Sequence, residues 1–329
     1  MINDDLFKKL QCTIIIILLS YHKRKEIVMN IKIIIIVFFL ANTLFSLPKE
    51  INNQLFKNNF DAWIQTNGPD GGGISDFAIS PDNPDKIYAL TGKNGLYYSE
   101  DQGKNWVKAT DIENFSANEI LILPEEPNIL YSNYQILSKS YDNGKTWENL
   151  TSGISDILYG GNHKNCFHVN SDGNFYLLCY NSELKFVVYK SENKGQSWQN
   201  ITGDLDTPLN PFPAGITVSE NGRIFAAVND RDLLTWHKGK IFYSDNDGEN
   251  WNELDYGQQE DRYITNIFTN PYKKNEIWFG EYSLYNDGAA PPNLFISDDN
   301  GENWNSIYLE GGSSHILNFS ENGNVYISN

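Results

Sequence analysis

Short stretches rich in β-branched and aromatic residues alternate with polar turns along most of the chain. In the first complete unit this pattern predicts strands at residues 74–80, 86–91, 95–99 and 105–109. The polar segment Pro81-Asp82-Asn83-Pro84 separates the first two, as a turn would. No stretch carries a helical hydrophobic period of useful length. The pattern therefore predicts an all-β protein built from units of four short strands.

An eight-residue pattern, Ser-x-Asp/Asn-x-Gly-x-x-Trp, occurs five times. Its copies are Ser99, Asp101, Gly103 and Trp106; Ser140, Asp142, Gly144 and Trp147; Ser191, Asn193, Gly195 and Trp198; Ser244, Asn246, Gly248 and Trp251; and Ser297, Asp299, Gly301 and Trp304. The Asp or Asn side chain is expected to accept hydrogen bonds from turn amides, and the Gly to take a positive φ. The Trp ring is expected to turn into apolar packing. We interpret the pattern as a turn that stabilises a hairpin.

The serines of successive copies are 41, 51, 53 and 53 residues apart. A near-constant period of this length is typical of repeat proteins, in which each unit buries its apolar face against the next. Four strands in a repeat of about 40–50 residues are typical of a β-propeller blade. We therefore predict a β-propeller of four-stranded blades that carries five of these turns.

The five turns resemble the Asp-box, or BNR, repeat of sialidases, xyloglucanase-type glycoside hydrolases and sortilin-like propellers. The lead-in Trp63-x-x-x-x-Gly68-Pro69-x-Gly71-Gly72 resembles the start of the xyloglucanase and sortilin-like branch. The resemblance covers roughly residues 60–329. It implies a propeller in which the Asp box is a structural turn at the blade periphery, away from the central channel. Because one fold hosts many activities, the resemblance alone implies no reaction.

The last unit is incomplete in the sequence. Strands expected at 315–319 and 324–328 flank the hairpin signal Asn322-Gly323, and the sequence stops at Asn329, where other units supply a third strand and an Asp box. Residues 60–66 resemble the fourth strand of a blade, so they could complete this unit and close the ring. The interpretation favoured by the pattern is five full blades followed by a sixth that is truncated at its C-terminal side.

The first 46 residues resemble an export signal. Met29-Asn30-Ile31-Lys32 precedes an apolar run, Ile33 to Ala41, that is too short to span a bilayer comfortably. We expect residues 1–46 to be a signal-peptide region with its true start at Met29, and residues 47–329 to form the propeller. An uncleaved signal anchor is the alternative. Cleavage would give a secreted, periplasmic or cell-surface protein with no membrane insertion of the mature chain.

The chain is strongly acidic. Its formal net charge is −17, and this becomes −20 without residues 1–46, because 19 basic and 39 acidic residues remain. Such a balance disfavours nucleic acid and anionic membranes as partners. It favours colloidal solubility. We expect a monomer, and the expected partner is a glycan or protein ligand.

Cys166 and Cys179 are the two cysteines after the signal region. If Asp172-Gly173 forms a two-residue turn, paired residues have numbers that add to 345, which places these cysteines opposite each other. They would face each other at a non-hydrogen-bonded site, where Cα atoms approach most closely. Export permits a disulfide there, and a pair of buried thiols is the alternative.

Motifs for glycoside hydrolysis are incomplete. The sialidase resemblance implies three arginines around a substrate carboxylate, whereas Arg223, Arg231 and Arg262 lie close together in sequence and the Arg-Ile-Pro entry motif is absent. The xyloglucanase resemblance implies a catalytic aspartate where this chain has Gly92. Asp76 and Asp156, both in a Gly-Ile-Ser-Asp sequence, are the remaining candidates for a catalytic carboxylate. Capping of a turn is their alternative role.

We expect no cofactor and no metal ion, because phosphate-binding loops and metal-ligand spacings are absent from the sequence. Aromatic residues outside the repeated turns, Trp236, Tyr282 and Tyr285, lie in long connections that could carry a ligand. The sequence therefore predicts an exported, non-catalytic β-propeller that binds or scaffolds a glycan or protein ligand. The alternative is a glycoside hydrolase, xyloglucanase-like or sialidase-like, with unrecognised or missing catalytic residues.

Overall fold

The structure is a computed structural model in which the chain divides into two units, Met1–Gln65 and Thr66–Asn329. It describes residues 68–69, 73–91, 95–109, 117, 119–134, 136–157, 166–206, 212–229, 239–256, 262–283, 293–308, 315–319 and 325–328, all in the second unit. The expected signal region, the Met29 start and the segment 60–66 lie outside these residues. Within the described segments, no helix is long and apolar enough to cross a membrane.

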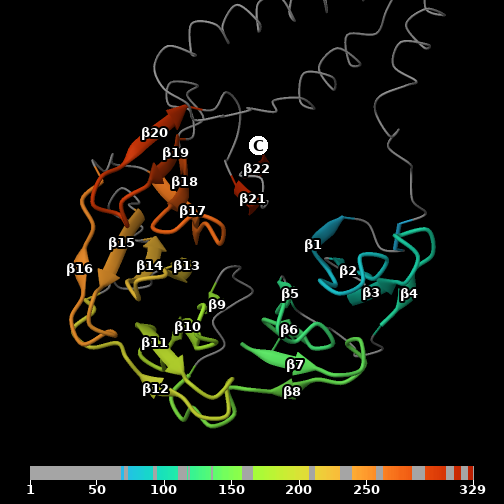
Figure 1. Ribbon diagram of the computed structural model, residues 1–329. Coiled ribbons are helices and arrows are strands. Elements are labelled where there is room, and N and C mark those ends of the chain that lie inside the picture. The colour runs from blue at the N-terminus through green and yellow to red at the C-terminus, as the bar shows by residue number, and fades with distance from the viewer. Residues whose placement is uncertain are drawn as a thin grey trace, which may run out of the picture. The chain divides into compact units, whose positions relative to one another are not determined.

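The described residues form antiparallel sheets whose strands follow chain order (Figure 1). Sheet 1 contains β1 (Ile74–Ile79), β2 (Ile87–Thr91), β3 (Gly95–Ser99) and β4 (Val107–Lys108), and sheet 2 contains β5 (Ile120–Ile122), β6 (Leu130–Ser132), β7 (Ser138–Ser140) and β8 (Glu148–Asn149). Sheet 3 contains β9 (Phe167–Val169), β10 (Phe175–Tyr180), β11 (Phe186–Ser191) and β12 (Gln199–Asn200), and sheet 4 contains β13 (Phe212–Val218), β14 (Ile224–Asn229), β15 (Gly239–Ser244) and β16 (Asn252–Glu253). Sheet 5 contains β17 (Arg262–Thr269), β18 (Ile277–Ser283), β19 (Asn293–Ser297) and β20 (Asn305–Tyr308), and sheet 6 contains β21 (His315–Phe319) and β22 (Val325–Ser328). The prediction of an all-β chain with four-stranded units is confirmed.

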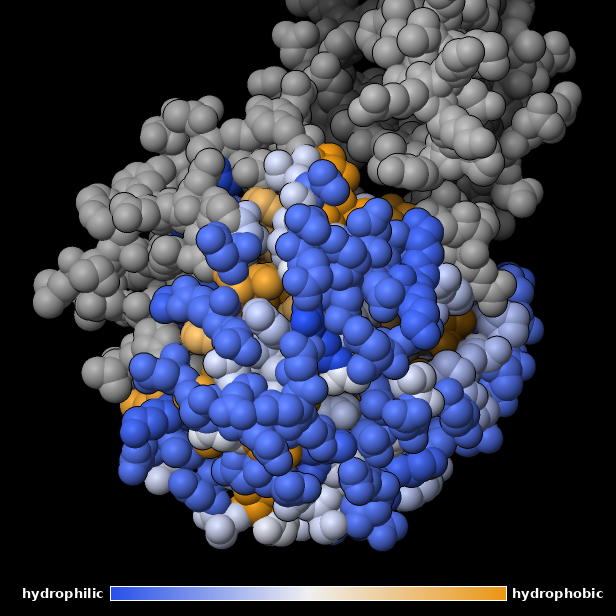
Figure 2. All heavy atoms as spheres, turned by 60° about the vertical axis from the view of Figure 1, so that its left-hand side comes forward, coloured by the Kyte–Doolittle hydropathy of each residue, from blue (hydrophilic) through white to orange (hydrophobic). Residues whose placement is uncertain are grey.

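Burial changes from the first strands of a sheet to its last. All six residues of β14 are buried, because sheet 4 is covered by a neighbouring sheet on each face. The fourth strands are short, and both residues of β16 are exposed. Figure 2, which brings β15, β16, β19 and β20 toward the viewer, shows a mainly hydrophilic surface. The second strand of sheet 4 is therefore mainly apolar, and its fourth strand is polar.

The apolar core is divided into clusters, each of which lies between two consecutive sheets. Between sheets 4 and 5, Phe225 of β14 packs with Ile267 of β17 and Phe279 of β18, and all three side chains are fully buried. Equivalent clusters join sheets 1 and 2, 2 and 3, 3 and 4, and 5 and 6. Full burial of a side chain of this size contributes about 1.5–3 kcal/mol. Each sheet is therefore stabilised mainly by its neighbours in the chain.

The five repeated turns share one hydrogen-bond pattern. The Ser hydroxyl accepts the N–H of the turn Gly at 2.8–2.9 Å and donates to the Asp or Asn side chain at 2.8–3.0 Å. That side chain in turn accepts the N–H four residues after it at 2.8–2.9 Å. Every turn Gly has a φ between +81° and +86°. The side-chain acceptor and the positive φ thus lie where the pattern placed them, and the Ser supplies a second acceptor that the sequence did not reveal.

The fourth residue of each turn adopts the left-handed conformation although none is a glycine. Gln102, Asn143, Lys194, Asp247 and Asn300 have φ values between +56° and +62°. Asn and Asp tolerate this conformation, whereas long side chains rarely adopt it. In three copies the side chain of this fourth residue, which is Asn143, Lys194 or Asp247, contacts the preceding sheet.

Contacts from the turns tie each sheet to the one before it. Tyr88 of sheet 1 donates to Asn143 at 2.6 Å, and Lys194 pairs with Glu126 of sheet 2 at 2.7 Å. Lys190 of sheet 3 pairs with Asp247 at 2.7 Å. The indole N–H of Trp198 donates to the carbonyl of Leu150 at 2.8 Å.

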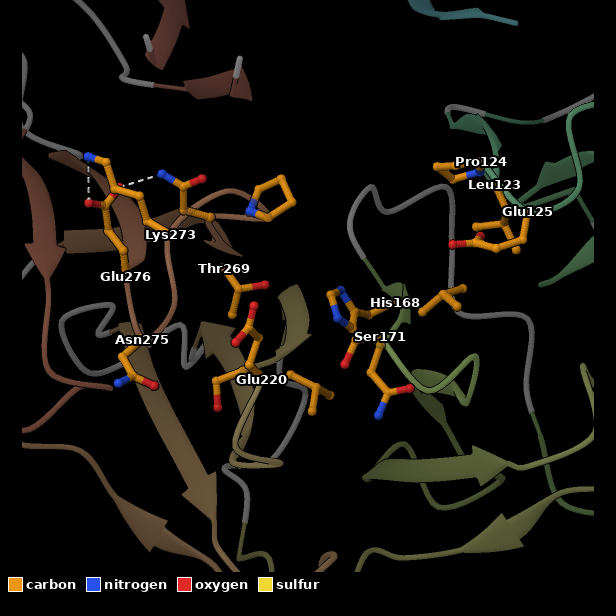
Figure 3. A pocket seen from close by; sticks show the side chains of 16 residues that line it. Leu123, Pro124, Glu125, His168, Ser171, Glu220, Thr269, Lys273, Asn275 and Glu276 are labelled. Atoms are coloured by element: carbon orange, nitrogen blue, oxygen red, sulfur yellow. Dashed lines mark hydrogen bonds and ion pairs between the residues drawn. The ribbon is translucent and has the colours of Figure 1, made fainter. Parts of the chain in front are cut away.

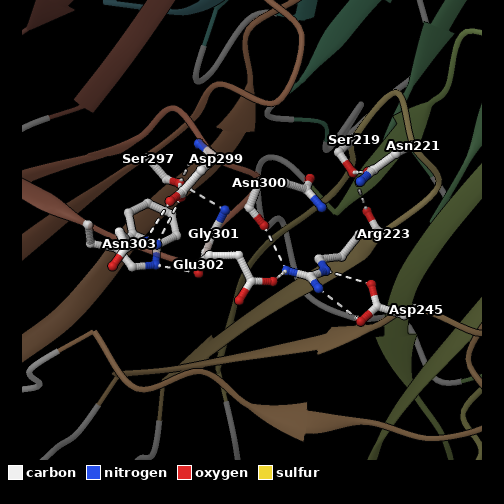
Figure 4. Close-up of polar contacts among 11 residues, drawn as sticks. Ser219, Asn221, Arg223, Asp245, Ser297, Asp299, Asn300, Gly301, Glu302 and Asn303 are labelled. Atoms are coloured by element: carbon white, nitrogen blue, oxygen red, sulfur yellow. Dashed lines mark hydrogen bonds and ion pairs between the residues drawn. The ribbon is translucent and has the colours of Figure 1, made fainter.

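Arg223 of sheet 4 makes the most extensive of these contacts (Figure 4). Its guanidinium binds both oxygens of Asp245 at 2.6 and 2.9 Å, the backbone carbonyl of Asn300 at 2.8 Å and the carboxylate of Glu302 at 2.7 Å. It also lies 4.6 Å from the ring centre of Tyr243. These bonds raise the pKa of Arg223, with Asp245 as the largest cause. Arg223 therefore clamps the last repeated turn onto sheet 4.

The hairpin between β9 and β10 differs from its prediction. Asn170 and Asn174 pair across a three-residue loop that ends in Gly173 at φ +78°, so paired residues have numbers that add to 344 rather than 345. Cys166 therefore lies opposite Leu178, whose N–H donates to its carbonyl at 2.9 Å. The assumed register was wrong, because the glycine closes a bulged three-residue loop instead of a two-residue turn. Both cysteines are thiols in the structure, and burial raises the pKa of each.

Candidate functional site

A pocket of about 360 Å³ lies where the innermost strands of sheets 2 to 5 end (Figure 3). It is lined by residues 123–125 after β5, 168–171 at the end of β9, 218–220 at the end of β13 and most of 269–276 after β17. Its volume falls in the lower part of the range found for small-ligand sites. Four sheets thus contribute one short segment each to a single cavity.

Glu276 organises the sheet 5 side of the pocket. Its carboxylate is buried and accepts hydrogen bonds from the side-chain amide of Asn270 and from the indole N–H of Trp278, the latter at 2.8 Å. The ammonium of Lys273 donates to its other oxygen at 3.0 Å. Three donors hold this carboxylate, so Glu276 and Lys273 form a neutral pair that fixes the loop.

His168 lies in the middle of the pocket wall. Burial lowers the pKa of His168 to about 4, and a hydrogen bond to the backbone of Val218 opposes this shift only in part. The imidazole is therefore neutral at pH 7. Because the hydrogen bond to Val218 uses one ring nitrogen as donor, the other nitrogen carries a lone pair and acts as an acceptor.

Two further carboxylates flank His168. Figure 3 shows Glu125 on one side of the imidazole and Glu220 on the other. Glu220 lies 3.3 Å from Lys274, whose side chain is largely exposed, and such pairs contribute little. Within the described residues, the Glu125 carboxylate makes no hydrogen bond or ion pair. With His168 neutral, three carboxylates against the ammonium of Lys273 give the pocket a formal charge of −2.

The two aspartates that the sequence singled out hold backbone amides of other segments. Asp76 of β1 accepts the N–H of Ile120 in β5 at 2.9 Å, and so links sheets 1 and 2. Asp156 accepts the N–H of Ser182 at 2.9 Å, and these Ser182 contacts lower the pKa of Asp156. Neither residue lines the pocket. In the structure, each aspartate therefore holds the backbone of another segment in position.

The other sequence candidates are only partly described. Trp236, Tyr285 and Gly92 lie outside the described residues. Tyr282 pairs with Tyr263 near the end of β18, but its side chain is outside the described part. Among described residues, no group of three or more His, Cys, Asp or Glu side chains is placed to hold a metal ion.

A second polar cluster, which the sequence did not indicate, is buried at the opposite ends of β17 and β18. Glu281 is 1 % exposed and lies 3.9 Å from the guanidinium of Arg262, itself 5 % exposed. One Glu281 oxygen accepts no hydrogen bond in the described structure. Burial raises the pKa of Glu281 to about 7, although contacts with Tyr256 and Arg262 act in the other direction. Its burial within the core gives it a structural rather than a ligand-facing position.

The fold, with its four-stranded sheets packed in chain order, defines a β-propeller. The chain belongs to the family of the DUF6242 beta propeller domain, whose model matches residues 83–310. No curated protein matches the sequence.

Solved structures share this fold at low sequence identity. The GH74 xyloglucanase from Xanthomonas campestris is 16% identical with a TM-score of 0.51, over 73% of this chain and 39% of that one. The GH74 enzyme from Niastella koreensis is 18% identical with a TM-score of 0.52, over 72% and 38% of the two chains. A putative TolB from Agrobacterium tumefaciens is 15% identical with a TM-score of 0.52, over 77% and 88%. This chain therefore spans about two fifths of the length of the GH74 proteins, and the likeness concerns the fold alone.

Proposed function

We propose that this protein is an exported β-propeller of Asp-box type that binds a glycan or protein ligand without converting it. The pocket at the ends of β5, β9, β13 and β17 carries this proposal, because it is a formed cavity at the position where several sheets converge. The Asp-box assignment is supported by the shared hydrogen-bond pattern of the five turns. The same proposal includes a sixth blade, to which β21 and β22 belong. It also includes export of the protein, directed by residues 1–46.

The carboxylates favour binding over glycoside hydrolysis. A hydrolase of this kind needs one protonated carboxyl as acid and a second carboxylate as base or nucleophile. Glu276 is held by three donors, and the pKa of Asp156 is lowered by its contacts with Ser182. Asp76 is engaged with a backbone N–H. These three carboxylates are therefore engaged within the protein, and none of them is a free acid or base.

The test compares binding and turnover on one panel of glycans and peptides, with chromogenic glycosides and xyloglucan included. We expect saturable binding without release of products. Ser171 is an exposed pocket residue, so Ser171→Trp should fill the cavity and weaken binding at least tenfold. Ser152→Trp, at an exposed serine that does not line the pocket, is the matched control and should leave binding unchanged.

Two results would overturn the proposal. The first is catalytic release of sugar by the wild-type protein, especially if Asp76→Asn abolishes it, because that outcome makes the protein a glycoside hydrolase. The second is binding that Ser171→Trp leaves unchanged, because the ligand would then contact another part of the molecule.

A further inference from the structure

Several donors on the pocket wall have partners within the protein. Lys273 and the amide of Asn270 both donate to Glu276. The hydroxyl of Ser219 lies 2.5 Å from the side-chain oxygen of Asn221 and 3.1 Å from the carbonyl of Arg223, and the hydroxyl of Thr269 lies 3.0 Å from that of Thr217. These groups are therefore partly engaged before a ligand binds.

Acceptors, in contrast, remain available. The carboxylate of Glu125 has no hydrogen bond or ion pair within the described part of the chain, and Glu220 has only the exposed Lys274 beside it. The second ring nitrogen of His168 carries a lone pair. The wall thus has a surplus of acceptors as well as a negative charge.

A ligand that complements this wall supplies donors and a positive charge. A hydroxyl group donates only one hydrogen bond and brings no charge, whereas a protonated primary amine has three donors and no acceptor. Glu125 and Glu220 lie on opposite sides of His168, so an ammonium beside the imidazole would be flanked by carboxylates (Figure 3). A guanidinium or a quaternary amine complements the charge, but only the compact ammonium directs three donors from one atom.

We infer that this pocket binds a protonated primary amine, carried either by a lysine side chain or by an amino sugar. The inference rests on the proposed binding function and names the chemistry that its ligand must share. Glu125 and Glu220 supply the charge, and the lone pair of His168 accepts one of the ammonium protons. The cavity volume of about 360 Å³ accommodates one lysine side chain or one sugar ring.

The experiment titrates the full chain with Nα-acetyl-lysine amide and with glucosamine at low ionic strength, and follows binding by calorimetry or NMR. The neutral analogues are the same two compounds with the amine acetylated. For each of the two amines that binds, we expect its acetylated form to bind at least tenfold more weakly. Glu125→Gln should weaken amine binding at least fivefold, and added salt should weaken it as well. Glu183→Gln, at an exposed glutamate paired with Lys185, is the control and should have no effect.

Comparison of the two amines distinguishes a protein ligand from a glycan ligand. Tighter binding of the lysine amide assigns a protein ligand, and tighter binding of glucosamine assigns a glycan. The inference is wrong if the acetylated compounds bind as well as the amines, or if Glu125→Gln changes nothing. If a neutral glycan or peptide binds and Ser171→Trp abolishes that binding, the proposed function stands while the amine inference fails.

Discussion

Replacing Glu281 with Gln should raise the free energy of unfolding by about 3 kcal/mol at pH 8. Burial raises the pKa of this carboxyl from 4.5 to about 7, so the folded protein must deprotonate a buried group that the unfolded chain ionises readily. The contribution to stability is fully present below pH 4.5 and is lost as the pH rises from 4.5 to 7. A glutamine keeps the shape of the protonated acid and has no charge to bury.

Urea unfolding of both proteins between pH 4 and pH 8 measures this difference. The two stabilities should be similar near pH 4 and should separate steadily up to pH 7. Other carboxyls of the protein also titrate in this range, and the comparison of variant with wild type cancels their effects. Glu183→Gln, at an exposed position, should follow the wild type at every pH. If the free energies of unfolding of Glu281→Gln and the wild type changed in parallel with pH, the pKa of Glu281 would not be raised in the folded protein.

Replacing Gly248 with Ala should destabilise the protein by about 4 kcal/mol or more. Gly248 is the turn glycine of sheet 4, with φ +85°, and a Cβ atom there would lie 2.1 Å from the carbonyl oxygen of Ile201, which directly follows β12 of sheet 3. The backbone of Ile201 cannot move aside without shifting the core between the two sheets. The variant therefore combines an unfavourable backbone conformation with a clash between sheets.

Gly222→Ala separates these two costs. Gly222 has φ +89°, and an added Cβ atom would meet nothing within 4 Å. This control should lose only the conformational part, about 1–2 kcal/mol. The midpoints of urea unfolding for the two variants give the difference directly. Equal losses would falsify the view that the turn glycine is required by the approach of the neighbouring sheet.

The repeated turn was predictable because its hydrogen bonds join residues within one short stretch. Ser297, Asp299 and Gly301 contact one another, so the residue types alone define the geometry. The conformation of the fourth residue was not predictable, because Gln102 and Lys194 do not favour a positive φ. The loop at Gly173 shows a similar limit, since the same Asp-Gly signal fits a two-residue and a three-residue hairpin.

The pocket could not be predicted from motifs, because each sheet contributes a different short segment that has no pattern of its own. Glu125, Ser171, Glu220 and Asn270 become neighbours only when sheets 2 to 5 pack in order. One signal was available. In each of sheets 2 to 5 the lining residues follow or end the first strand, so alignment of these repeats at that point would have collected them.

The fourth residue of the repeated turn also makes the sheets distinguishable to one another. Lys194 of sheet 3 meets Glu126 of sheet 2, whereas Asp247 of sheet 4 meets Lys190 of sheet 3. If the turn of sheet 4 took the place of the sheet 3 turn on sheet 2, Asp247 could not make the ion pair that Lys194 makes, and Glu126 would lose its ammonium partner. A chain of near-identical units risks pairing out of order. Here one backbone conformation with different side chains gives successive pairs of sheets different contacts, which favours pairing in chain order.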